Sequence, residues 1–188
     1  MSQESLPDRP ARWLRVDADG VVTGISAPWA ELVRTAFVGC LAPASVGRRF
    51  APLGSAATAI WEHLLDETRR GRPVTAELWA ATPEAAAKFE LTVQRSDGDD
   101  EELALELLFE RARPQPQPFF DPQAPRGDDA IRACGFCQRL DSFRWTEPEL
   151  ALVQLRVDPV GTQPRLKPDV CVECELRLRG SLVQRLAS

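Results

Sequence analysis

The chain has 188 residues, of which 44% are hydrophobic and 27% charged, a composition typical of a folded globular protein. Its formal net charge of −5 argues against a protein that coats nucleic acid or an anionic membrane. The sequence has no apolar run near the roughly 20 residues that cross a bilayer, and its polar start lacks the features of a signal peptide. We therefore expect a cytoplasmic protein.

The first predicted elements are two short strands joined by a tight turn, at residues 12–25, where Gly20 supplies the turn chemistry. Ser26 is placed to cap the N-terminus of a short helix. Pro28 falls in the first turn of that helix, where a missing N–H costs little. The segment 37–50 contains glycine and proline, and we expect it to be irregular.

A longer amphipathic helix is predicted over residues 55–69, where apolar residues recur at helical spacing until Gly71 ends the pattern. Three strand candidates follow, at residues 73–80, 87–95 and 103–111. The last two alternate between apolar and polar residues, and we expect the acidic run 97–102 to be the turn between them. This order predicts an α+β fold in which helices cover one face of a five-stranded antiparallel sheet.

Four short motifs accompany this order of elements. They are Asp17 to Gly20 before a strand, Ser26 at a helix start, Val46 to Arg48 before the long helix, and Gly71 to Val74 at the opening of the third strand. With these motifs the chain resembles the PAS domain over roughly residues 12–111, although PAS domains often carry Asn where this chain has Ser26. The resemblance implies a sensory domain, here residues 1–112, that can form a homodimer through the outer face of its sheet.

A ligand pocket in such a domain would lie between the long helix and the sheet. Its lining would come from Leu64, Leu65, Phe89, Leu91, Leu105 and Leu107. The same side chains are sufficient to fill a small core without a void, so a packed core is the alternative. Trp79 falls on the opposite face of its strand, where it would mark an exposed contact surface. His63, the only histidine, lies off the apolar stripe of its helix, which argues against haem.

A proline-rich segment at residues 113–128 predicts a boundary between two domains. Its five prolines favour extended backbone and forbid a helix. A semi-rigid spacer is the favoured interpretation. The alternatives are a ligand for an aromatic-lined groove and docking of Phe119 and Phe120 on either neighbouring part. Residues 129–188 would then form a separate C-terminal module.

Four of the five cysteines form two C-x-x-C pairs with 33 residues between them, Cys134 with Cys137 and Cys171 with Cys174. Because cytosolic thiols stay reduced, this spacing predicts one tetrahedral zinc site rather than disulfides. Four thiolates leave no open position for water, so the zinc would be structural and would add folding energy to a module with a small core. The fifth cysteine, Cys40, is interpreted as a packing residue.

Between the cysteine pairs, the spacing from Thr146 to Glu149 is that of a capping box, and we expect a helix over residues 147–155. Proline and glycine should break any regular structure over residues 159–168. A closing helix, interrupted at Gly180, is predicted after the second pair. The module resembles the cysteine-bearing segment that follows PAS domains in some bacterial sensor proteins. A Ser-His pair often found there is replaced by Lys167 to Asp169.

Together these features predict a bacterial cytoplasmic protein of signal transduction, in which a PAS-like domain is coupled to a structural-zinc tail that binds a protein partner. Binding of a small-molecule ligand is a further possibility that the sequence leaves open. The sequence has no phosphate-binding loop or nucleophile motif, so we expect no enzyme activity. One alternative is a zinc-finger regulator that binds nucleic acid through Arg177, Arg179 and Arg185. The other is a thiol redox switch that acts through zinc release.

Overall fold

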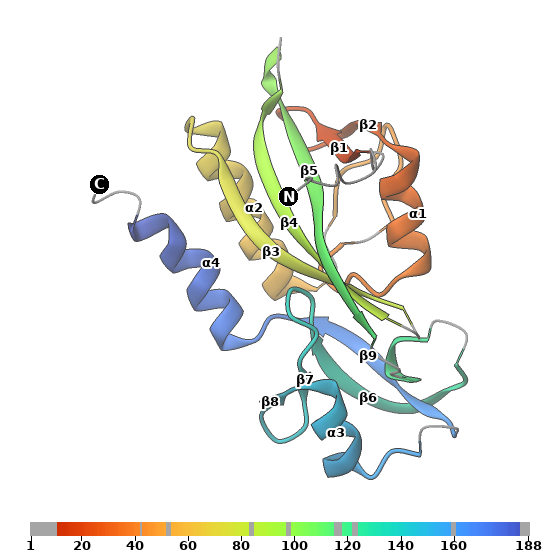
Figure 1. Ribbon diagram of the computed structural model, residues 1–188. Coiled ribbons are helices and arrows are strands. Elements are labelled where there is room, and N and C mark those ends of the chain that lie inside the picture. Colours follow the sequence, from red (N-terminus) through yellow and green to blue (C-terminus); the bar gives the residue numbers. More distant parts are fainter. Residues whose placement is uncertain are drawn as a thin grey trace, which may run out of the picture.

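The computed structural model describes residues 11–41, 43–51, 54–82, 85–96, 99–114, 118–121, 124–158 and 161–184. Within these residues the chain is a mixed α+β structure with two sheets and four α-helices (Figure 1). None of the described helices is both long and apolar enough to cross a membrane.

The larger sheet has five antiparallel strands in the order β2-β1-β5-β4-β3. Its elements are β1 (Arg12–Val16), β2 (Val22–Ile25), α1 (Ala27–Thr35), α2 (Ser55–Arg69), β3 (Val74–Ala81), β4 (Ala85–Ser96) and β5 (Asp99–Pro114). The predicted hairpin, both helices and the three strands are confirmed. The hydroxyl of Ser26 accepts hydrogen bonds from the backbone N–H groups of Trp13 and Trp29, so it both caps α1 and ties that helix to β1.

The predicted acidic turn is shorter than expected. Residues 99–102 belong to β5, because Ser96 already pairs with Asp99 and the two long strands continue their ladder from there. Residues 97 and 98 lie outside the described residues. The acidic side chains at this end of β5 include Glu102, which accepts a hydrogen bond from Thr23 on the edge strand β2.

The second sheet has four strands in the order β8-β7-β6-β9. Its elements are β6 (Arg126–Cys134), β7 (Leu140–Asp141), β8 (Trp145–Thr146), α3 (Pro148–Leu155), β9 (Gln163–Asp169) and α4 (Val172–Gln184). The prediction that prolines prevent regular structure before the second cysteine pair is wrong, because β9 contains Pro164 and Pro168 and pairs in parallel with β6. β9 is an edge strand, where a residue without an N–H is tolerated.

Both helices of this second part, which comprises β6 to α4, differ in detail from the prediction. α3 has the expected span, but its N-cap is Glu147, and Thr146 instead shares a hydrogen bond with Ser142. The predicted capping box is therefore absent. α4 continues through Gly180 without interruption. The residues after position 184, where the predicted closing helix ended, lie outside the described residues.

The predicted spacer is a docked connection. Its two ends belong to β5 and β6, and between them Phe119 and Phe120 in the 3-10 turn η1 (Pro118–Phe120) are 0% and 1% exposed. They pack in a small cluster with Ala81 of β3 and Ile131 of β6. The guanidinium of Arg126 donates to the carbonyl oxygens of Phe119 and Asp121. Buried aromatic rings hold this segment in place, which its proline content did not predict.

The principal hydrophobic core crosses from one sheet to the other. It includes Leu14, Trp61 and Leu91 of the first part together with Phe136, Val170 and Leu178 of the second. Figure 1 shows the second sheet below the first, with α4 extending from their junction past β3. The cysteine-bearing part is thus packed against the five-stranded sheet and α2.

Candidate metal centre

The four predicted ligands meet at the junction of the two sheets. Cys134 ends β6, Cys137 lies in the turn after it, and Cys171 and Cys174 lie at the start of α4. Their sulfur atoms all lie within 4.8 Å of one another, so the prediction that the two pairs form one cluster is confirmed. All four are free thiols rather than disulfides.

The spacing of the sulfur atoms fits a tetrahedral metal ion. The Sγ atoms of Cys137 and Cys171 are 3.6 Å apart. A metal at about 2.3 Å from each of four thiolates gives sulfur separations of about 3.8 Å along the edges of the tetrahedron. Four sulfurs without an open position can hold a soft or borderline divalent cation, and the geometry alone does not identify which one.

The first cysteine pair is held by a tight turn. The Cys134 carbonyl accepts from the N–H of Gln138, and the Cys134 N–H donates to the carbonyl of Arg139. Gln138 has a left-handed backbone, with φ of 67°. Glycine is required at position 135 of this turn, because a Cβ there would lie 2.5 Å from the backbone nitrogen of Cys40. The turn therefore fits closely against the segment that carries Cys40.

The second cysteine pair, Cys171 and Cys174, lies at the N-terminus of α4. The backbone N–H groups of Cys171 and Cys174 point at the sulfur atoms of Cys134 and Cys171, at 3.4 Å each. Arg177, one turn further, places a guanidinium nitrogen 3.6 Å from Cys174 Sγ while it pairs with Glu77 of β3. These donors favour the thiolate forms, because each offers positive charge to sulfur.

The four sulfurs share their protons unequally. Hydrogen bonds from Cys137, then from Cys171 and Cys174, hold the pKa of Cys134 well below its usual range. Hydrogen bonds with Cys134 and Cys171 raise the pKa of Cys137. A cation that binds all four thiolates must displace the remaining protons, so metal binding here is expected to weaken at acidic pH.

Access to the cluster is confined to one side. Cys134, Cys171 and Cys174 are at most 3% exposed, whereas Cys137 is half-buried. Cys137 lines a pocket of about 290 Å³ whose other walls include Trp79 and the arginines 113, 139 and 177. The Trp79 ring lies below the Arg113 guanidinium, at 5.0 Å, and is half-buried. Trp79 is thus partly covered by the cysteine-bearing part, and its role in a contact surface stays a prediction.

Phe136, between the first two cysteines, joins the cluster to the larger sheet. Its carbonyl accepts a hydrogen bond from the Trp79 N–H of edge strand β3, at 3.0 Å. Its side chain is fully buried, with the ring centroid 6.4 Å from that of Trp61 on α2. Trp61 in turn donates its indole N–H to the carbonyl of Cys40. Sequence patterns missed these contacts, because they join segments far apart in the chain.

The six residues predicted to line a ligand pocket belong to the buried hydrophobic core, and the pocket among them stays a prediction. All six are buried, with Leu65 the most exposed at 8%. Among the pockets found in the described residues, Leu65 lines one at the edge of α2 that is lined mainly by other residues. Cys40 is fully buried in the same core, as expected of a packing residue, and burial raises its pKa. His63 is half-buried on α2.

No protein-family model, curated protein or solved structure compared with the chain matches it.

Proposed function

We propose that the four cysteines bind one structural zinc ion and that the metal fastens the second sheet and α4 to the larger sheet. The observation that carries this proposal is the convergence of four sulfurs within 4.8 Å, three of them buried. Zinc is the metal that such closed four-thiolate sites hold most often. Elemental mass spectrometry on protein purified under reducing conditions should find one zinc per chain. Less than half an equivalent would contradict the proposal.

We further propose that the protein is a bacterial cytoplasmic sensory adaptor without catalytic activity, with a PAS-like domain over residues 12–111. The five-stranded antiparallel sheet with α1 and α2 packed against it is compatible with this assignment. Homodimerisation would use the outer face of the sheet, where Leu108 is 66% exposed. Sedimentation analysis tests this step, because a Leu108→Glu variant should sediment as a monomer where the unchanged protein sediments as a dimer.

The surface that would receive a protein partner lies on the second part. Phe143, at the tip between β7 and β8, is 92% exposed with φ of 76°, and Val153 on α3 is 73% exposed. The neighbouring Ser142 donates a hydrogen bond to Gln154, which places Phe143 beside α3. A pull-down with Phe143→Ser should lose partners that the unchanged protein captures. A matched change of the exposed Leu176 to Ser on α4 should retain them.

The nucleic-acid alternative receives less support from the described residues. Of its three arginines, Arg177 is paired with Glu77 and Arg179 with Glu175, and Arg185 lies outside the described residues. A redox switch is favoured by one observation, the partial exposure of Cys137 beside a pocket. If mild peroxide releases zinc and changes partner binding together, the redox function holds, and zinc release without a change in binding contradicts it.

A further inference from the structure

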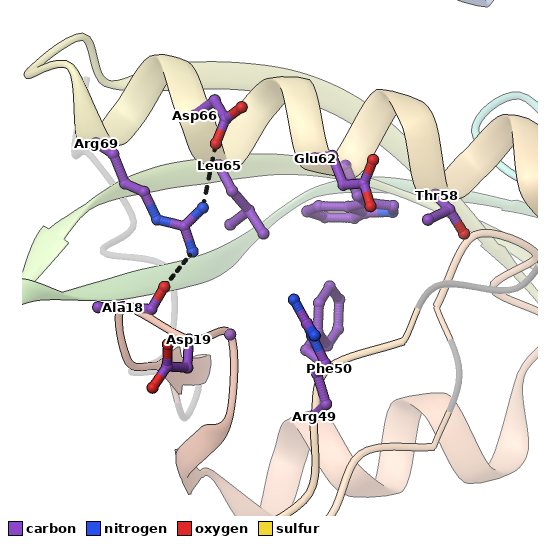
Figure 2. A pocket seen from close by; sticks show the side chains of 11 residues that line it. Ala18, Asp19, Arg49, Phe50, Thr58, Glu62, Leu65, Asp66 and Arg69 are labelled. Carbon is purple, nitrogen blue, oxygen red and sulfur yellow. Dashed lines mark hydrogen bonds and ion pairs between the residues drawn. The ribbon is translucent and has the colours of Figure 1, made fainter.

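A separate pocket of about 360 Å³ lies between α2, the β1–β2 turn and residues 49–50 (Figure 2). It is lined by Ala18, Asp19, Gly20, Arg49, Phe50, Thr58, Trp61, Glu62, Leu65, Asp66 and Arg69. This volume is near the lower end of the range of about 300–1,000 Å³ for small-molecule sites, so an occupant must be small.

The rim of this pocket carries opposite charges that do not pair with each other. In Figure 2 the Arg49 guanidinium points from the loop toward α2, and Glu62 lies on the helix opposite. Among the described residues, neither of these side chains nor that of Asp19, which also lines the pocket, has an ion pair or hydrogen bond. By contrast, Arg69 at the far end is engaged by Asp66 and by the carbonyl of Ala18. Arg49 and Glu62 are therefore free to receive a ligand of complementary charge.

The floor of the pocket is apolar. Phe50 and Trp61 meet edge to face, with ring centroids 5.4 Å apart, and Leu65 extends the same surface along α2. Trp61, Leu65 and Phe50 are 1%, 8% and 9% exposed, so a ligand would contact only a small part of each side chain. A short aliphatic group would bury this surface and gain hydrophobic energy in proportion to the area covered.

We propose that this pocket binds a small zwitterion with an apolar side chain, the chemical class of a free aliphatic amino acid. The ligand carboxylate would pair with Arg49, its ammonium with Glu62, and its side chain would contact Phe50 and Leu65. A simple anion would meet the repulsion of Glu62 and Asp66, and a simple cation would leave Arg49 without a partner. A ligand with both charges can pair with Arg49 and with one of the two carboxylates, Glu62 or Asp19.

Trp61 lies between this pocket and the metal centre. That side chain forms the floor of the pocket, stacks near Phe136 of the first cysteine pair and donates to Cys40, which fits against Gly135.

Isothermal titration of the full-length protein with three matched probes tests the ligand class. L-leucine has both charges, 3-methylbutylamine lacks the carboxylate and 4-methylpentanoate lacks the ammonium. Leucine should bind at least about tenfold more tightly than either of the other two, a difference that corresponds to about 1.4 kcal/mol. Equal binding of all three, or no heat from leucine up to about 10 mM, would overturn the proposal.

Two charge variants locate the site. Arg49→Gln and Glu62→Gln should each weaken leucine binding about tenfold, and the adjacent Arg48→Gln, which does not line the pocket, should leave it unchanged. An equal loss in Arg48→Gln would contradict the assignment. A protein without zinc would contradict the metal proposal and leave the three-probe comparison valid.

Discussion

The metal centre and the pocket beside α2 both lie against Trp61, and they differ in how their polar atoms are satisfied. At the metal centre, backbone N–H groups and Arg177 all point at sulfur, and three ligands are closed to solvent. In the pocket, Arg49 and Glu62 face solvent and have no partner in the described part of the chain. A prearranged, enclosed donor set is suited to permanent binding, and an open site with free charges is suited to reversible binding.

Removing a metal ligand should produce the largest effect. In Cys134→Ser we expect loss of the metal and melting of β6, β9 and α4, because structural zinc contributes on the order of 10 kcal/mol in finger peptides. Amide hydrogen exchange should show lost protection in these elements and retained protection in β4 and β5. As the control, Cys40→Ser makes the same chemical change at a buried cysteine and should keep a full equivalent of metal. Equal metal loss in both variants would contradict the assignment of ligands.

Changing the contact between the cysteine turn and the Cys40 segment should have the next largest effect. A Cβ at Gly135 would meet backbone atoms of Cys40 and Gly39 at 2.5 and 2.7 Å, so Gly135→Ala should cost about 1–3 kcal/mol of unfolding free energy. At Gly127 the same methyl would meet only the Thr162 side chain, at 3.2 Å. Urea unfolding should therefore show a smaller loss of unfolding free energy for Gly127→Ala than for Gly135→Ala. Equal losses would contradict the account, because they would show that the close backbone contact at Gly135 has no special effect on stability.

Arg177 tests whether charge near sulfur retains the metal. Its ion pair with Glu77 is about half exposed, so Arg177→Gln should change stability by less than about 1 kcal/mol. Zinc transfer to a chelator should nevertheless become several-fold faster, because the variant loses a positive charge 3.6 Å from Cys174 Sγ. Arg179→Gln removes a neighbouring surface ion pair on the same helix and should transfer zinc at the original rate. Identical acceleration in both would indicate a general effect of charge on α4.

The smallest expected effect is the loss of the stabilising contribution of Glu77 at acidic pH. The Lys88 ammonium lowers the pKa of Glu77, partial burial opposes that shift, and Arg177 reinforces it. Because the folded-state pKa is below the unfolded value, the contribution is present above the unfolded pKa of 4.5 and is lost as pH falls through the folded value. Since Glu77 is 43% exposed, this contribution should stay below about 1 kcal/mol. In Glu77→Gln the stability difference from the unchanged protein should shrink as pH falls below 4.5; a constant difference would contradict it.

Local patterns predicted the elements of the larger sheet because each depends on residues close in sequence. Gly20 in the hairpin turn, Ser26 as a helix cap and Gly71 after α2 have the expected conformations. The cysteine cluster was also predictable, because the ligand spacing of C-x-x-C reflects the size of a tight turn. In each case the decisive interaction spans a few residues.

The remaining features depend on contacts that no local pattern records. The strand β9 forms despite its two prolines because it lies at the edge of its sheet. It pairs in parallel with β6 on one side only, so backbone N–H groups are not needed for pairing on the other side. The proline-rich connection is docked because Phe119 and Phe120 are buried against β3 and β6. The pocket arises where α2 meets both the β1–β2 turn and residues 49–50, a contact between three separate segments. These are tertiary effects that sequence periodicity cannot supply.

X-ray absorption at the zinc edge of the purified protein tests the central claim most directly. The proposed zinc site predicts a single shell of four sulfur atoms at about 2.3 Å from one zinc per chain, with no oxygen or nitrogen ligand. A mixed shell with an oxygen or nitrogen neighbour, or a metal content below half an equivalent, would contradict the closed four-cysteine centre.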